Sequence, residues 1–273
     1  MKALIPAAGY GTRFLPASKT IPKEMLPVGA KPAIQLIVEE ALAAGAEEVV
    51  IVTSPDKPSL RRHFDVDAVW HARCAKKPEV DAELTHLDEI GKRIRWTFQT
   101  EQKGLGHAVL QGADLLRGET DPVLVLLGDA LVSGEAPSAA MAAISRAHGG
   151  ASVVGLEEVP LEKVSRYGIV AGDFVDERVL KLTDLVEKPQ PDVAPSRLAI
   201  AGRYLLEPAV FDLLATQTPG HGGEIQLTDS IRRLLAEKSV YGYRYPGRRH
   251  DIGNPAGYLK ALQAFAAADP NTR

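Results

Sequence analysis

The sequence predicts an α/β fold in which a doubly wound mixed sheet carries a smaller β-rich portion. Three observations lead to this fold class. Residues 3 to 53 read as strand, loop, helix and strand, at the spacing of α/β folds. The uninterrupted apolar run from Val123 to Leu127 is typical of a central strand that is buried on both faces. From Tyr167 to Tyr204, short β-rich pieces alternate with Gly, Asp and Pro, which indicates added antiparallel strands.

The first half is expected to alternate strands and helices. Residues 3 to 6 form a short apolar strand, and residues 48 to 53 form the next one. Residues 32 to 44 form a helix between them, because Pro32 suits its first turn and Gly45 suits its end. Further helices are expected at residues 58–64, 79–90 and 139–147.

The second half is expected to add strands and helices to the same sheet. Its elements are a strand at 151–155, helices at 207–215 and 226–237, and a C-terminal helix from Pro255 to Ala267. Asn254 suits the N-cap of that last helix. The chain shows no repeat, low-complexity tract or linker. We therefore expect residues 1–150 and 151–273 to be two halves that share one core.

Composition excludes several classes of function. The 273 residues carry 32 basic and 35 acidic side chains, a formal net charge of -3, so we expect no nucleic-acid or membrane partner and only local anion sites. Cys74 is the single cysteine, so no intrachain disulfide can form and a reducing compartment is expected. The start of the chain does not resemble a secretory signal, and no apolar run is long enough to span a membrane. We expect a soluble, cytoplasmic protein.

The loop after the first strand has the composition of a phosphate cradle. Gly9 and Gly11 let the backbone approach anionic oxygens closely, and Arg13 and Lys23 add formal positive charge. A dinucleotide fingerprint would need a third glycine where the chain has Phe14. The sequence therefore predicts a site for a nucleoside triphosphate. The alternative is an ordinary glycine turn with two solvated cations.

Seven segments together resemble the sugar-nucleotide pyrophosphorylase family, and within it the bacterial UTP:glucose-1-phosphate uridylyltransferases. They are Ile5 to Arg13, Pro16 to Lys19, Pro22 to Pro27, Lys103 to Val109, Val186 to Pro189, Glu224 to Asp229 and His250 to Asn254. These segments follow the family's order over nearly the whole chain. The resemblance is weakest over residues 65–93. It implies a Rossmann-like sheet with a nucleotide-binding first half, residues 1–150, and a sugar-phosphate-binding second half, residues 151–273. It further implies a strand at residues 95–100 and a helix at 104–115.

The activity that this resemblance implies joins UTP and glucose 1-phosphate into UDP-glucose and pyrophosphate, with Mg²⁺. Asp129 follows the central strand, where open α/β sheets place ligands, and the resemblance assigns it to the metal together with Asp251. Two carboxylates suffice for Mg²⁺, which also takes phosphate oxygens and water. Alternatively, Asp129 caps a turn and Asp251 pairs with a neighbouring arginine. Many relatives have a second Asp where this chain has Ala130.

The resemblance also assigns the sugar-phosphate residues. Lys188 matches the lysine that binds the sugar phosphate, and Glu187 matches the carboxylate that accepts from sugar hydroxyls. Gly168 and Gly202 match positions where the backbone lies close to the hexose. The alternatives are a solvated charge pair at 187 and 188 and ordinary turn or bulge glycines.

Base recognition is expected from Gln99 and Gly104, because an amide offers a donor and an acceptor to the imide edge of uracil and a glycine permits close approach. Glu24 is a further base contact by the same chemistry, unless it only pairs with a nearby lysine. Ala8 and Gly9 contribute backbone groups. His107 is expected to have a packing or capping role.

Three other functions stay open at this point. The enzyme could use dTTP or another sugar 1-phosphate, because uracil and thymine differ by a single methyl group. A sugar-nucleotide-binding protein could keep the fold without turnover. A glycosyltransferase would instead use Asp65-Val66-Asp67 as its metal motif. Because relatives are often homo-oligomers, we also expect self-association.

Overall fold

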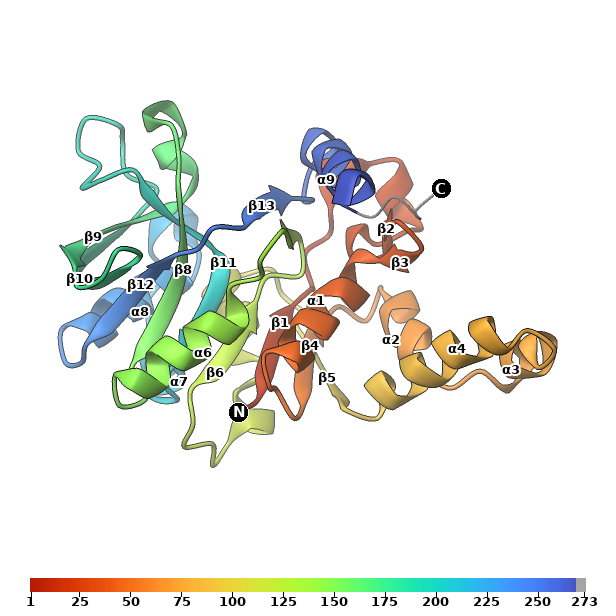
Figure 1. The fold of residues 1–273 in the computed structure, drawn as a ribbon. Coiled ribbons are helices and arrows are strands. Elements are labelled where there is room, and N and C mark those ends of the chain that lie inside the picture. Colours follow the sequence, from red (N-terminus) through yellow and green to blue (C-terminus); the bar gives the residue numbers. More distant parts are fainter. Residues whose placement is uncertain (269–273) are drawn as a thin grey trace.

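A nine-stranded mixed sheet runs through the protein in the order β5-β4-β1-β6-β11-β8-β12-β10-β9 (Figure 1). The structure is a computed structural model that describes residues 1–268. β1, β4, β5 and β6 are parallel, and β11 lies antiparallel between β6 and β8. The mixed α/β fold class expected from the sequence is confirmed.

The elements have the following bounds. The strands of the large sheet are β1 Ala3–Pro6, β4 Val49–Thr53, β5 Ile94–Phe98, β6 Val123–Leu126, β8 Ser152–Glu158, β9 Gly168–Phe174, β10 Val179–Glu187, β11 Leu198–Leu206 and β12 Val240–Arg244. Two small ladders pair β2 Pro27–Val28 with β3 Lys31–Pro32, and β7 Ala130–Ser133 with β13 Arg248–Asp251. The helices are α1 Ala33–Ala43, α2 Pro58–Phe64, α3 Ala68–Cys74, α4 Pro78–Gly91, α5 Leu105–Leu110, α6 Ser138–Ala147, α7 Ala209–Ala215, α8 Leu227–Leu235 and α9 Pro255–Ala268.

Helices cover both faces of the sheet, and this explains the uninterrupted apolar strands. Successive residues of one strand point to opposite faces, so Ile5 joins the cluster under α1 and α6, while Leu4 joins the cluster under α5, α7 and α8. Both side chains are fully buried. The first cluster includes residues from either side of residue 150, such as Ile5 and Val153.

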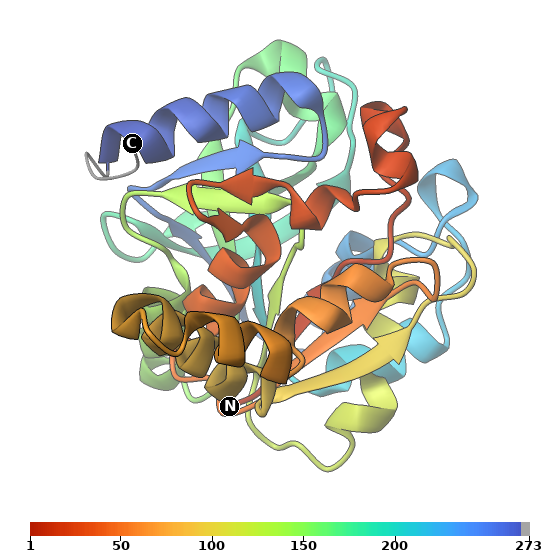
Figure 2. The ribbon, with the colours of Figure 1, turned by 90° about the vertical axis from the view of Figure 1, so that its right-hand side faces the viewer.

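The topology gathers several loops at one edge of the sheet. The chain runs from β1 outward through β4 to β5 and then returns to β6 on the other side of β1. Ligands bind at such reversals in open α/β sheets. The glycine loop follows β1 and Asp129 follows β6, so both lie at this edge. The β7–β13 ladder adds Asp251, and α9 packs on that ladder (Figure 2).

Two expectations for local structure are wrong. The helix expected at 104–115 ends as α5 at Leu110 and continues as a separate 3-10 turn, Ala113–Leu116. The break lies at Gly112, where a Cβ would collide with a side-chain carbon of Leu4 at 2.2 Å. The sequence also missed helix α3. Asp67, part of the alternative glycosyltransferase metal motif, caps that helix by accepting from the backbone N–H groups of Val69 and Trp70.

Helices α3 and α4 form a hairpin that extends from one edge of the molecule (Figure 1). His71 of α3 lies between two carboxylates of α4, with Nδ1 3.1 Å from Asp81 and Nε2 2.8 Å from Asp88. Over residues 1–268, no helix is both long and apolar enough to cross a bilayer.

Candidate active site

Two adjoining pockets open at the carboxyl edge of β1 and β6. The first pocket, of about 320 Å³, contains seven of the expected residues: Ala8, Gly9, Lys23, Glu24, Gln99, Gly104 and Asp129. The second pocket, of about 300 Å³, contains Arg13, Asp129, Gly168, Glu187, Lys188, Gly202 and Asp251. Asp129 borders both pockets. Gly11 borders neither; it has a positive φ of 67° and leads into the 3-10 turn that carries Arg13.

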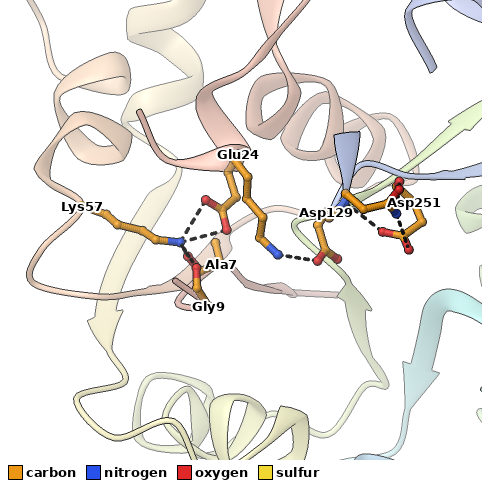
Figure 3. A network of polar contacts seen from close by, with 9 residues as sticks. Ala7, Gly9, Glu24, Lys57, Asp129 and Asp251 are labelled. Atoms are coloured by element: carbon orange, nitrogen blue, oxygen red, sulfur yellow. Dashed lines mark hydrogen bonds and ion pairs between the residues drawn. The ribbon is translucent and has the colours of Figure 1, made fainter. Parts of the chain in front are cut away.

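Lys23 and Asp129 form the ion pair at the centre of this arrangement. Lys23 Nζ donates to Asp129 Oδ2 at 2.5 Å. Figure 3 shows Asp129 between the Glu24 segment and Asp251. Burial alone would raise the pKa of Asp129, but the Lys23 ammonium outweighs this effect and holds that pKa below its usual range. Burial likewise acts to lower the pKa of Lys23, and Asp129 outweighs it, so that pKa is raised. Both groups are therefore charged at neutral pH.

Asp251 lies beside Asp129 because two distant segments pair. β13 runs antiparallel to β7 with Asp251 opposite Ala130, and the N–H of Ile252 donates to the carbonyl of Asp129 at 2.8 Å. The N–H of Gly253 donates to Asp251 Oδ1 at 2.8 Å and orients the carboxylate. The alternative pairing of Asp251 with a neighbouring arginine is wrong, because Arg249 pairs with Glu157 instead.

The two carboxylates border one small space. A Cβ on Gly253 would lie 2.9 Å from Asp251 Oδ1 and 3.0 Å from Asp129 Oδ2. Carboxylate oxygens are ligands that Mg²⁺ prefers, and this ion usually completes its shell with phosphate oxygens and water. Within residues 1–268 no group of three His, Cys, Asp or Glu could hold a metal, so the donor set fits a cation that also binds substrate. The position where many relatives have a second Asp is Ala130 in this chain, and it is buried. It therefore supplies no second carboxylate.

Glu24 and Gln99 lie deeper in the first pocket. Both oxygens of Glu24 accept from Lys57 Nζ at 2.9 Å, and the Glu24 side chain is only 1% exposed. The partner of Glu24 is thus Lys57, and not Lys19 or Lys23, which are nearer in the sequence. The amide nitrogen of Gln99 donates to the carbonyl of Gly104 at 3.3 Å and lies 2.9 Å from His107 Nδ1. The contact with His107 orients Gln99, in agreement with the packing role expected for this histidine.

Gly104 is required by its surroundings. Its φ is +99°, a region that side chains rarely adopt, and a Cβ there would lie 2.7 Å from the Cβ of Glu224 and 2.8 Å from the carbonyl oxygen of Ile225. The close packing of these two segments places Glu224 on the border of both pockets.

Lys188 occupies an unusual backbone conformation. Its φ is +47°, and it is the single residue other than glycine with a positive φ in the described part of the chain. Such a conformation costs of order 1–3 kcal/mol and is often found at functional sites. The N–H of Lys188 donates to the carbonyl of Tyr167 at 2.9 Å, and its Nζ lies 3.2 Å from Glu187.

The sugar-side glycines lie against the same pocket. Gly168 is opposite Glu187 in the β9–β10 ladder, and Glu187 accepts from the hydroxyl of Thr228 at 2.7 Å. Gly202 lies in β11 with a φ of +75°, and a Cβ there would approach the Cβ of Ala130 to 3.1 Å. Both glycines line the second pocket.

Comparison with known proteins assigns the family. The model of the nucleotidyl transferase family matches residues 2–268. The chain belongs to this family.

Its relatives give a narrower similarity. The chain is 42% identical to a UTP–glucose-1-phosphate uridylyltransferase of Staphylococcus epidermidis, over 98% of this chain and 93% of that protein. It is 43% identical to the Staphylococcus haemolyticus protein of the same name, over 100% and 94%. A crystal structure of UDP-glucose pyrophosphorylase complexed with UDP-glucose superposes with a TM-score of 0.86 at 41% identity, covering 98% of this chain and 99% of that one. A UTP-bound UGPase from Acinetobacter baumannii superposes with 0.89 at 37% identity, covering 99% and 95%.

Sequence reasoning missed three cations near the pockets of this nucleotidyl transferase. Arg166 borders the second pocket, directly before Tyr167. Arg249 borders the same pocket, stacks over the ring of Tyr167 at 4.7 Å and pairs with Glu157. Lys57 lies behind the first pocket. Only Lys57 had a usable signal, because it follows a parallel strand, where ligand-binding loops gather.

Proposed function

We propose that this protein forms UDP-glucose and pyrophosphate from UTP and glucose 1-phosphate. The observation that carries the proposal is the meeting at Asp129 of two pockets that are each lined by cationic side chains. One pocket is built on a glycine loop and the other on Glu187 and Lys188. The names of the full-length relatives support the choice of substrates.

The reaction brings together two anions that repel each other. An oxygen of the sugar phosphate attacks the α-phosphorus of UTP, a new P–O bond forms, and the bond from the α-phosphorus to the bridging oxygen of pyrophosphate breaks. No side-chain nucleophile is needed, so catalysis depends on positioning and on neutralising charge. Lys23 in the first pocket and Arg13, which reaches the site from the border of the second pocket, would hold the triphosphate and take up charge on the leaving pyrophosphate. Lys188 aligns the attacking phosphate.

Asp129 and Asp251 would hold Mg²⁺ at the point where the pockets meet. A bound divalent cation neutralises phosphate charge and orients phosphate oxygens. Lys23 pairs with Asp129, and its ammonium also lies beside the glycine loop: a Cβ added to Gly9 would lie 3.9 Å from Lys23 Nζ. Both carboxylates lie close to Gly253, where a side chain would crowd them.

Recognition of the two substrates divides between the pockets. Gln99, Gly104 and Glu24 would contact the uracil, and the backbone of Ala8, Gly9 and Gly11 would contact the nucleotide. Glu187 would accept hydrogen bonds from the hexose, and the lack of a side chain at Gly168 and Gly202, which line the second pocket, would allow its close approach.

A matrix assay tests this function. Each of several nucleoside triphosphates, dTTP included, is paired with each of several sugar 1-phosphates, with and without Mg²⁺, and pyrophosphate release is measured. The highest kcat/KM is expected for UTP with glucose 1-phosphate, and only with Mg²⁺. Faster release with another pair would reassign the substrates. Absence of release from every pair would favour a binding protein, and consumption of UDP-glucose with another acceptor would favour a glycosyltransferase.

The cytoplasmic location and the homo-oligomeric state belong to the same proposal. A single buried thiol, that of Cys74, suits a reducing compartment. Sedimentation at several protein concentrations measures the oligomeric state, and a mass of one chain throughout would contradict self-association.

A further inference from the structure

A buried lysine lies directly behind the glycine loop. Lys57 follows β4 and precedes α2, and its side chain is 7% exposed. Its Nζ contacts the carbonyl oxygen of Ala7 at 2.9 Å and that of Gly9 at 2.6 Å, in addition to both oxygens of Glu24 at 2.9 Å. Figure 3 shows these contacts converging on one nitrogen. Because an ammonium has three N–H donors, these acceptors leave none for a ligand.

These contacts set the direction of the loop's donors. In a trans peptide the C=O and the following N–H point to opposite sides. When Lys57 holds the carbonyls of Ala7 and Gly9, the N–H groups of Ala8 and Tyr10 therefore point away from Lys57. Gln102 holds the carbonyl between them, that of Ala8, at 3.2 Å.

Four successive N–H groups of the glycine loop have no hydrogen-bond partner in the described part of the chain. In residues 1–268 the backbone N–H groups of Ala8, Gly9, Tyr10 and Gly11 donate to no protein acceptor. Ala8 and Gly9 border the first pocket. A run of unpartnered N–H groups in a turn is a binding surface for anionic oxygen, and here its shape is imposed from behind by one side chain.

We propose that Lys57 is a positioning residue for nucleotide binding: it orients the glycine-loop peptides toward the triphosphate and fixes the carboxylate of Glu24 at the base. This inference rests on the proposed function and adds to it a residue that touches neither substrate. Lys57 and Glu24 neutralise each other, so the pair adds no net charge to the pocket. Its effect on the nucleotide is geometric, and glucose 1-phosphate, bound in the second pocket, is insensitive to it.

Four variants separate positioning from simple charge balance. Lys57→Met removes the donors and leaves Glu24 unpaired; Lys57→Met with Glu24→Gln removes the donors and the charge; Glu24→Gln alone keeps the donors to the loop. Lys57→Arg keeps the charge, but a planar guanidinium cannot bring one nitrogen to all these acceptors. Lys31→Met is the matched control, since it breaks the 2.8 Å ion pair with Glu39 away from both pockets.

The measurements are the Kd of UTP by calorimetry, the KM of each substrate, and folding by circular dichroism. We expect the double variant to bind UTP at least about tenfold more weakly than Glu24→Gln alone. This is the effect expected from the loss of hydrogen bonds donated by a charged group. Lys57→Arg should fall between parent and double variant, and the KM of glucose 1-phosphate should stay within about twofold in all variants. Lys31→Met should match the parent.

Two results would overturn the inference. In the first, the double variant binds UTP as tightly as Glu24→Gln, which would make the contacts to Ala7 and Gly9 irrelevant. In the second, the KM values of both substrates rise together, which is the signature of a general structural defect. If Lys57→Met alone fails to fold, the double variant and Lys57→Arg still decide. The proposed function fails separately, if the parent protein neither binds UTP nor releases pyrophosphate from it.

Discussion

The two pockets that meet at Asp129 differ in how they hold their charges. At the first pocket the cations are largely shielded from solvent and already paired, Lys23 in the pocket with Asp129 and Lys57 behind it with Glu24. In the second pocket Arg249 is likewise paired, with Glu157, but Arg13 and Arg166 are exposed and have no carboxylate partner among residues 1–268, and the ammonium of Lys188 pairs with its neighbour Glu187.

This difference indicates two ways of preparing for an anion. In the first pocket the charges are part of the packed fold, so the site exists in its binding shape before the ligand arrives. In the second pocket Arg13, Arg166 and Lys188 are more exposed to solvent, so we expect them to take their final positions with the ligand. Substitutions at Lys23 or Asp129 should therefore change stability and function together, and those at Arg13, Arg166 or Lys188 should change function alone.

The largest effect is expected at the shared residue. Asp129→Asn keeps the shape of the side chain but removes the charge that pairs with Lys23 and would bind the metal. We expect turnover to fall at least about a thousandfold and the melting temperature to drop. Asp114→Asn is the control, because Asp114 pairs with Arg117 on the exposed surface. Turnover within about tenfold of the parent would remove Asp129 from the mechanism.

A matched pair of lysine substitutions tests the comparison directly. Lys188→Ala and Lys23→Ala should each lower kcat/KM by about a hundredfold or more. Only Lys23→Ala should also lower the free energy of unfolding, by about 1–3 kcal/mol, because it leaves Asp129 without its partner. The Lys23 side chain is 13% exposed and that of Lys188 is 32% exposed. Urea unfolding measures the difference, and equal destabilisation would contradict the distinction between the pockets.

Arg166→Ala should separate the two substrates. Because Arg166 borders only the second pocket, we expect the KM of glucose 1-phosphate to rise about three- to tenfold with little change for UTP. Arg117→Ala is the control for loss of an exposed arginine. A selective rise in the KM of UTP would assign Arg166 to the triphosphate instead.

The smallest effect is expected outside both pockets. Hydrogen bonds that the His71 ring donates to the carboxylates of Asp81 and Asp88 raise the pKa of His71 above its usual value of 6.5. The protonated form is therefore favoured in the folded protein, and its stabilising contribution is complete below pH 6.5 and is lost as pH rises through the raised pKa. Hydrogen exchange in α3 should speed up over that range beyond the intrinsic pH effect. His71→Ala should remove this dependence and leave turnover unchanged; coupled loss of turnover would link the hairpin to the pockets.

Local pattern was sufficient for most of the framework. Apolar runs buried on both faces predicted β1, β4 and β6 within about one residue, because burial from two sides demands uninterrupted apolar side chains. The pattern over residues 65–93 was weaker, and the short helix α3 was not predicted from it. Its N-cap, Asp67, was interpreted as part of an alternative metal motif. Strands from both halves share one sheet. The assignment of nucleotide binding to residues 1–150 and of sugar-phosphate binding to residues 151–273 stays a prediction.

By itself, the sequence determined that β1, β4 and β6 are strands and that the glycine loop and Asp129 follow two of them. Parallel strands bring their carboxyl ends to one edge, so these two features were expected to meet. Only the tertiary structure decided that β13 pairs with β7 to deliver Asp251, that Lys57 reaches Glu24 and the loop carbonyls, and that Arg166 lines the same pocket as Lys188. These arrangements bring distant segments together, and they depend on register and side-chain packing that no local periodicity encodes.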